Sequence, residues 1–158
     1  MTDQFPTSRV SATPTTLLRQ AQRADIAAMH RVRLAVRENR LTSTALGEAD
    51  YVAEIEASGR GWVIQAQREI VAFAVGNAST QNIWALFVAP GHEGQGHGRR
   101  LHDTMVEWLF AQGIERLWLS TGPGTRAQRF YGAAGWSFRR VLPSGEHHLE
   151  LYRRPAVR

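Results

Sequence analysis

One short stretch, Gly94-Gln95-Gly96-His97-Gly98-Arg99-Arg100-Leu101, combines glycine and arginine in a way that suits ligand binding. An apolar run, Ile83–Val88, precedes it, and a segment with helical periodicity follows it. A strand that passes through a glycine-rich turn into a helix presents backbone N–H groups at the positive end of the helix dipole, and such groups bind phosphate. Because glycine has no Cβ, the backbone can approach the anion closely. The stretch therefore predicts a ligand that carries phosphate.

Three familiar motifs match this stretch poorly. A Walker loop has lysine and then Ser or Thr after its last glycine, where this chain has Arg99-Arg100. A dinucleotide fingerprint, G-x-G-x-x-G, has its third glycine one residue later than here, and it needs an acid where this chain has Ser120-Thr121. The segment His92–His97 looks like a zinc-protease helix, but its histidines are one residue too far apart and glycines interrupt it. None of the three motifs explains the stretch.

A fourth motif fits better. The run Val88–Leu101 resembles motif A of the GNAT family of N-acetyltransferases, which is a valine-x-proline strand end, then [R/Q]-x-x-G-x-[G/A], then a helix. Further along, Phe130-Tyr131-Gly132-Ala133-Ala134-Gly135-Trp136 resembles the second hallmark, an aromatic–tyrosine pair at a helix end before a glycine–aromatic pair. The two signatures stand in the family's order and spacing, and the resemblance covers residues 60–140. The other interpretation is that the glycines only make a tight turn.

The resemblance implies an α/β fold with one domain: a mixed central sheet of about seven strands with a splayed parallel pair, flanked by about four helices. It implies that acetyl-CoA is the cosubstrate, that it lies between the splayed strands at Ile83–Val88 and Leu117–Ser120, and that no metal takes part. The cofactor-binding residues that it implies belong to the first strand, the glycine-rich turn and one later position. They are Leu86, Phe87, Val88, Glu93, Gly94, Gln95, Gly96, His97, Gly98, Arg99, Arg100 and Thr125.

Acetyl transfer from a thioester to an amine needs a neutral amine, a stabilised oxyanion and a proton for the departing thiolate. Tyr131 stands at the position of the family's general-acid tyrosine. The pKa values of a tyrosine and a thiol, roughly 10 and 8.5, are close enough for this transfer. The alternative for Tyr131 is a core aromatic residue, a role that Phe130 fits better. A backbone N–H near Phe87 or Val88 would stabilise the oxyanion.

The sequence indicates the general base less clearly than the general acid. The family often uses a glutamate on its fourth strand, but the segment Asn82–Ala89 contains no acid. Glu38, at the end of the first predicted helix, borders the region that forms the family's acceptor site, and it is our candidate. The alternatives are Glu48, Asp50 and Glu54, or a chain of ordered water with no dedicated base.

Two positions depart from the family's pattern. Glu93 stands where motif A has Arg or Gln, so it places a negative charge beside the predicted pyrophosphate site. A side chain that points outward would weaken binding little, whereas one that points inward would weaken it severely. Gly124 stands where the family often has an asparagine that binds the pantetheine arm, and Thr125 or Ser120 could take that role.

Apolar periodicity predicts the elements that position these residues. After a loose lead-in over residues 1–14, one domain fills residues 15–158. We expect a strand at 15–20, a helix capped by Asp25 that runs to about residue 38, a short helix at 48–58, strands at 61–67, 69–76 and 82–88, a helix at 98–112, a strand at 117–119, a helix at 125–134, and paired strands at 136–141 and 147–152. Both faces of the strand at 82–88 are apolar, so it should be central. We assign Trp84, Leu86 and Val88 to one face and Ile83, Ala85 and Phe87 to the other. The helix at 98–112 should bury Leu101, Met105, Trp108 and Leu109.

Composition narrows the function classes. The chain has 158 residues, a net charge of +5 and no cysteine, which excludes disulfides, thiolate zinc sites and an acyl-cysteine intermediate. It has neither a membrane-length apolar stretch nor the apolar core of a signal peptide, so we expect a cytoplasmic protein. The scattered arginines indicate a solvated surface, or attraction for an anion such as coenzyme A or nucleic acid. The tryptophans lie in apolar runs rather than among basic residues, which disfavours nucleic-acid binding.

Partners follow mainly from the resemblance. It favours a small-molecule amine over a peptide as the acceptor, bound near residues 37–60 and 143–147, and it allows a homodimer. We expect His92, His97 and His102 at the surface, and His147-His148 cannot both bind one metal from the same strand face. The alternatives to an enzyme are an inactive acetyl-CoA-binding sensor and a basic nucleic-acid-binding module.

Overall fold

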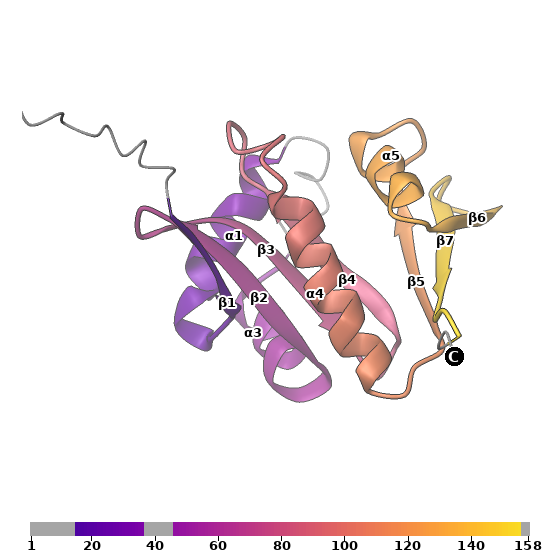
Figure 1. The fold of residues 1–158 in the computed structure, drawn as a ribbon, viewed down its shortest axis with the longest axis horizontal. Coiled ribbons are helices and arrows are strands. Elements are labelled where there is room, and N and C mark those ends of the chain that lie inside the picture. Colours follow the sequence, from indigo (N-terminus) through magenta and orange to yellow (C-terminus); the bar gives the residue numbers. More distant parts are fainter. Residues whose placement is uncertain (1–14, 37–45, 156–158) are drawn as a thin grey trace, which may run out of the picture.

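The strands of the computed structural model form one seven-stranded sheet in the order β1-β2-β3-β4-β5-β7-β6 (Figure 1). The structure describes residues 15–36 and 46–155. The strands are β1 (Thr16–Gln20), β2 (Gly59–Ala66), β3 (Glu69–Asn77), β4 (Asn82–Val88), β5 (Arg116–Thr121), β6 (Ser137–Val141) and β7 (His147–Tyr152). Neighbouring strands are antiparallel except β4 and β5, which run parallel. The predicted mixed sheet with one parallel pair is confirmed.

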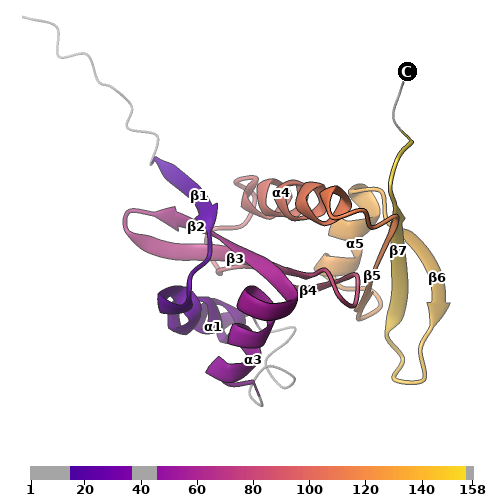
Figure 2. The same cartoon turned by 90° about the horizontal axis from the view of Figure 1, so that it is seen from below.

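Helices cover both faces of this sheet. Within the described ranges the α-helices are α1 (Ile26–Ala35), α3 (Glu48–Val52), α4 (His97–Ala111) and α5 (Arg126–Ala133). A 3₁₀ helix, η1 (Arg23–Asp25), precedes α1, and a π-helix, η3 (Ala53–Ser58), continues α3. Figure 2 shows α4 and α5 on one side of the sheet and α1 and α3 on the other. No helix in the described part of the chain is long and apolar enough to cross a membrane.

Each helical layer has its own buried cluster. Leu101, Met105 and Leu109 of α4 are fully buried against the sheet, as their spacing predicted. On the other face, the cluster under α1 and α3 contains the fully buried rings of Tyr51 and Phe73. The central strands are therefore covered on both sides, and β4 lies in the middle of the sheet as expected.

A β-bulge in β4 changes which residues face each layer. In the register of β3 with β4, Val75 pairs with Ala85 but Gly76 pairs with Ile83, which leaves Trp84 as an extra residue. As a result Trp84 and Ala85 both pack on the α1/α3 side, while Ile83 packs on the α4 side. The predicted grouping is therefore wrong for two residues, because strict alternation does not continue through the bulge. Trp84 does not share a face with Leu86 and Val88, and Ile83 does not share one with Ala85 and Phe87.

β4 and β5 meet at one end and then diverge (Figure 1). Their register contains a single pair, Asn82 with Trp118. There the Trp118 backbone N–H donates to the Gln81 carbonyl at 3.0 Å, and its indole Nε1–H donates to the Thr80 carbonyl at 2.8 Å. Beyond this point β4 pairs only with β3, and β5 only with β7, within the described residues. Two unpaired strand edges therefore face each other toward the carboxyl ends of β4 and β5.

Asp25 does not cap α1, contrary to the prediction, because its side chain makes no hydrogen bond to that helix. Its carboxylate accepts two hydrogen bonds from the Arg19 guanidinium, both at 2.8 Å, and one from the Gln22 backbone N–H at 2.8 Å. The hydrogen bond from Arg19 is the main cause that lowers the pKa of Asp25. The structure describes α1 as far as Ala35, so Glu38 lies outside the described residues.

Candidate active site

The glycine-rich turn joins the end of β4 directly to α4. Gly94 and Gly96 have φ angles of +73° and +82°, and Gly96 is the N-cap residue of α4. An ideal Cβ at either position would have no heavy atom within 4 Å, so the space in front of the turn is open. Glycine is needed here for the left-handed backbone, and its absent side chain leaves the start of α4 accessible to a ligand.

His97, the first residue of α4, is buried, with 3% of its surface exposed. Its Nε2 lies 3.1 Å from the Gln95 side-chain oxygen, and its Nδ1 has no hydrogen-bond partner among the described residues. Burial lowers the pKa of His97. The predicted surface position is wrong for His97 and also for His102, which is likewise 3% exposed, because both side chains of α4 point into the protein rather than toward solvent.

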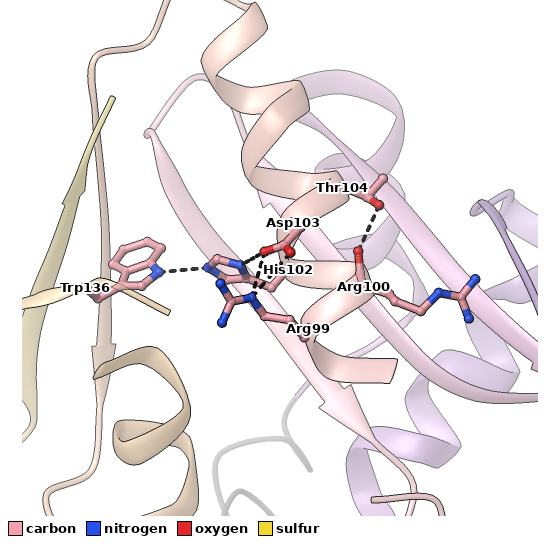
Figure 3. A network of polar contacts seen from close by, with 6 residues as sticks. All are labelled: Arg99, Arg100, His102, Asp103, Thr104 and Trp136. Atoms are coloured by element: carbon pink, nitrogen blue, oxygen red, sulfur yellow. Dashed lines mark hydrogen bonds and ion pairs between the residues drawn. The ribbon is translucent and has the colours of Figure 1, made fainter. Parts of the chain in front are cut away.

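The side chains of Arg99 and Arg100 extend to opposite sides of α4 (Figure 3). Arg99 pairs with Asp103 one turn later, with Nε 3.0 Å from Oδ1. Arg100 reaches β1, where its Nη1 donates to the Thr16 hydroxyl at 2.9 Å. Since both guanidinium groups bond to other residues, the donors that the turn itself offers are backbone N–H groups.

Glu93 turns back onto its own loop. Its Oε2 accepts a hydrogen bond from the Gly91 N–H at 2.8 Å, and its Oε1 lies 3.6 Å from Nη1 of Arg126 at the start of α5. Hydrogen bonds from the backbone N–H groups of Glu93 itself and of Gly91 lower the pKa of this carboxyl. The side chain is 41% exposed, and its carboxylate is directed to the Gly91 N–H and toward Arg126.

The backbone of β4 presents alternate residues to the gap. The Ala89 N–H donates to the Val71 carbonyl of the β3 side at 2.8 Å. Since backbone polar groups alternate between the two edges of a strand, Phe87 also faces β3, whereas Leu86 and Val88 direct their N–H and C=O groups toward β5. Of the three predicted main-chain contacts on β4, two therefore face the diverging edge and one is used inside the sheet.

Thr125 is the N-cap residue of α5. Its hydroxyl accepts from the Gln128 N–H at 3.1 Å and donates to the Gly122 carbonyl at 2.8 Å, and the Gln128 side chain in turn accepts from the Gly124 N–H at 2.7 Å. This is a variant of the capping box, and the Thr-x-x-Gln spacing could have revealed it. The hydroxyl holds the turn before α5.

Tyr131 lies on α5 with 7% of its surface exposed. Its ring centroid is 5.2 Å from that of Phe130, 5.6 Å from Trp136 and 6.3 Å from His102. Burial raises the pKa of Tyr131 above its usual value, so the phenol stays protonated at neutral pH. Its hydroxyl donates to no other group in the described ranges 15–36 and 46–155, which leaves that proton available to a ligand.

A polar cluster that the sequence did not reveal lies on the opposite face of β4. The Tyr51 hydroxyl is 2.8 Å from Nδ1 of His30, and the Tyr51 ring packs edge-on against Trp84 with centroids 5.0 Å apart. The Arg33 guanidinium lies 4.7 Å from the ring centroid of Trp84 and 4.9 Å from that of Phe87. Burial raises the pKa of Tyr51, and a hydrogen bond from Arg33 opposes that shift. His30 and Arg33 have the polar character of a solvated face of α1, which is why spacing alone did not identify this cluster.

The acids considered as general bases differ in their surroundings. Glu54 accepts a hydrogen bond from the Asn77 amide at 2.6 Å, and Asp50 accepts one from the Gly47 N–H at 2.8 Å. Both therefore support the local structure of α3 and η3. Within the described residues, no group of three or more His, Asp or Glu side chains could hold a metal ion.

The sequence model of the acetyltransferase (GNAT) family matches residues 26–136. The chain belongs to the GNAT family. The matched region runs from α1 to Trp136 and contains the glycine-rich turn, the diverging pair of strands and Tyr131. As a GNAT protein it is an acyl-CoA-dependent N-acyltransferase. No curated protein matches the chain.

Solved GNAT structures share the fold at low sequence identity. The ribosomal-protein-S18-alanine N-acetyltransferase from Escherichia coli aligns with a TM-score of 0.72 and 16% identity over 90% of this chain and 97% of that one. The PaiA N-acetyltransferase from Thermoplasma acidophilum, in complex with coenzyme A, aligns with a TM-score of 0.70 and 12% identity over 88% of this chain and 99% of that one. A putative streptothricin acetyltransferase from Bacillus anthracis, in complex with acetyl coenzyme A, aligns with a TM-score of 0.69 and 14% identity over 88% of this chain and 100% of that one.

Proposed function

We propose that this GNAT protein transfers the acetyl group of acetyl-CoA directly to the primary amine of a small-molecule acceptor. The observation that carries the proposal is the juxtaposition of two unpaired strand edges with an open, glycine-lined helix start. Two of the similar structures were solved with coenzyme A or acetyl coenzyme A, which supports the same cosubstrate here. The chain has no cysteine, which excludes an acyl-cysteine intermediate, and in the proposed reaction the acceptor amine attacks the thioester itself.

The residues present fit such a cosubstrate. The outward N–H and C=O groups of Leu86 and Val88 would pair with the amides of the pantetheine arm as an added strand would. The backbone N–H groups from Gly94 to Arg99 would hold the pyrophosphate, whereas the Arg100 N–H already donates to the Gly96 carbonyl at 3.1 Å. The contact between the exposed Gln95 side chain and the buried His97 ring would support that turn. Thr125 would contribute by fixing the start of α5.

The chemistry would then be divided among three groups. The Val88 N–H, which faces the gap, would stabilise the oxyanion that develops on the thioester carbonyl. Tyr131 would donate its proton to the departing sulfur, and its burial keeps that proton in place until the thiolate forms. Glu38, or ordered water, would take a proton from the acceptor amine. The acceptor would approach from the α1/α3 face, where Arg33 and Tyr51 lie beside β4.

Calorimetric titration tests the cosubstrate first. Acetyl-CoA should bind one-to-one, and NAD, which also carries a pyrophosphate, should not bind. Turnover is then screened by release of the CoA thiol with two sets of acceptors, small primary amines and peptides with free N-termini. Binding without turnover on either set would favour the sensor alternative, and turnover on the peptides alone would replace the small-molecule acceptor with a peptide.

A further inference from the structure

We propose that His102 is a positioning residue for Tyr131: its hydrogen bond to Trp136 fixes α5, and with it the Tyr131 hydroxyl, relative to α4. The inference rests on the proposed function, in which Tyr131 is the general acid. His102 itself touches neither substrate nor reacting atoms in this scheme.

The hydrogen bond is buried and directional (Figure 3). The Trp136 indole Nε1–H donates to Nε2 of His102 at 2.9 Å, and the two residues are 6% and 3% exposed. Because Nε2 accepts this bond, the imidazole proton is on Nδ1, from which it is donated to Oδ1 of Asp103 at 2.8 Å. Arg99 holds Asp103 from the preceding turn. This chain of contacts therefore fixes both the tautomer and the ring orientation of His102; it runs from Arg99 through Asp103 and His102 to Trp136.

Trp136 in turn contacts Tyr131 through both its backbone and its ring. Its backbone N–H donates to the Tyr131 carbonyl at 3.0 Å, and the two rings pack edge to face with centroids 5.6 Å apart. The His102 ring also packs against Phe130, the neighbour of Tyr131, at 5.8 Å. A shift of Trp136 away from α4 would therefore move Tyr131 as well.

The splayed sheet makes this connection necessary. β4 and β5 share one register pair at Asn82 and Trp118, so the sheet does not fix the distance between α4 and α5 at its open end. His102 is one turn into α4 from the glycine-rich turn, and Tyr131 is on the other side of the gap. The His102–Trp136 bond thus connects the phosphate-binding end of the site to the acid.

The bond requires a neutral imidazole. The charged groups that act on His102 are Asp103 and Arg99 of its own helix, and the rings that pack against it from beyond α4 are uncharged. The cavity beside His102 is also lined by Glu150 of β7 and by Arg153 and Arg154, which follow β7. Burial lowers the pKa of His102, so Nε2 remains an acceptor at neutral pH. Protonation would place a second N–H opposite the Trp136 donor and break the bond.

The first test is a double-mutant cycle with His102→Leu, Trp136→Phe and the double variant. Hydroxylamine serves as the acceptor, because its transfer product is acetohydroxamate and one CoA thiol is released per turnover. In each single variant we expect kcat to fall by about 10- to 100-fold, the size of effect that follows from misplacing a reacting group by about 1 Å. KM for acetyl-CoA should change by less than about threefold, and the double variant should be no slower than the slower single variant.

Trp108→Phe is the matched control. Trp108 lies on the same helix and packs against Trp62, with ring centroids 5.7 Å apart, on the side of α4 that faces β2. This variant loses an indole of α4 without touching Tyr131, so its kcat should stay within twofold of wild type. Unchanged kcat in both His102→Leu and Trp136→Phe, or an equal loss in Trp108→Phe, would overturn the proposal.

A second readout needs no turnover. In ¹⁵N-histidine-labelled wild-type protein at pH 7, His102 should show the neutral Nδ1-protonated tautomer. Trp136→Phe should shift the Nε2 resonance, because Nε2 loses its donor while Asp103 still holds the proton on Nδ1. An Nε2-protonated or charged His102 overturns the proposal whatever acceptor the enzyme uses. Tyr131→Phe separates the two hypotheses: an unaltered rate removes Tyr131 from the proposed chemistry, whereas a loss in Tyr131→Phe with none in His102→Leu removes His102 alone.

Discussion

Replacement of Tyr131 by Phe should abolish most turnover while leaving the fold and acetyl-CoA binding intact. The ring is held by Phe130, Trp136 and His102, and phenylalanine preserves those contacts. The hydroxyl has no partner in the described residues, so its removal leaves no buried group unpaired. We therefore expect the free energy of unfolding to change by no more than about 0.5 kcal/mol.

The expected loss in rate is much larger. A positioned general acid contributes about 10²- to 10⁴-fold, which corresponds to about 3–5 kcal/mol of the activation barrier. Because the wild-type phenol donates and is not ionised at neutral pH, the loss should appear in kcat, with the dissociation constant for acetyl-CoA unchanged.

Thiol release is a clean assay for this protein, because the chain has no cysteine that could react with the thiol reagent. Tyr152→Phe is the control. Tyr152 is 49% exposed on β7 and donates its hydroxyl to Glu150 at 3.1 Å, so this variant removes a phenol outside the gap. If Tyr131→Phe is as active as Tyr152→Phe, the acid is another group and the chemical part of the argument is refuted.

Three further predictions concern charge and packing. Glu93→Gln should tighten acetyl-CoA binding about two- to fivefold at low salt, because it removes a half-exposed negative charge from the predicted pyrophosphate turn; titrations at rising salt should show the difference shrinking. Asp25→Asn should lower the free energy of unfolding by about 1–3 kcal/mol at neutral pH. Arg19 lowers the pKa of Asp25 below its ordinary 3.8, so this stabilisation is present above that pH and is lost as the pH falls through the lowered value; urea unfolding of both proteins should converge in acid. Gly76→Ala should destabilise the fold by about 1–3 kcal/mol, since a Cβ there would lie 2.9 Å from the Leu109 side chain and 3.0 Å from that of Met105; the penalty should be smaller in a Leu109→Ala background, where only Met105 still crowds the Cβ, and an equal penalty in both backgrounds would contradict the packing.

The elements that sequence predicts best are those with strong local periodicity. The stripe through Leu101, Met105 and Leu109 specifies both the extent and the buried face of α4, and the apolar run of β4 places it in the centre of the sheet. The bulge at Trp84 could not be predicted, because it depends on how β3 and β4 pair rather than on residue order. Asp25 was assigned to the wrong role for a similar reason, since its strongest partner, Arg19, lies on a strand before the helix.

The candidate site shows the same division between local and distant information. The left-handed glycines of the turn follow from residue type and position, and they are where the pattern put them. The burial of His102 does not follow from its surroundings in the chain, because its hydrogen-bond partner Trp136 is 34 residues away. Glu93 combines both kinds of contact, a local hydrogen bond from the Gly91 N–H and an ion pair with Arg126 of the distant helix α5.

The single register pair between Asn82 and Trp118 also has a mechanical consequence. It makes that end of the sheet a pivot, and β4 extends from it by six residue steps, a lever arm of about 20 Å. A rotation of about 5° between the two halves would displace the far ends of β4 and β5 by about 2 Å. Small changes of angle at the Trp118 contact are thus amplified where the thioester would lie, so the stiffness of this contact, together with the His102–Trp136 bond across the open end, sets how accurately the two halves of the site meet.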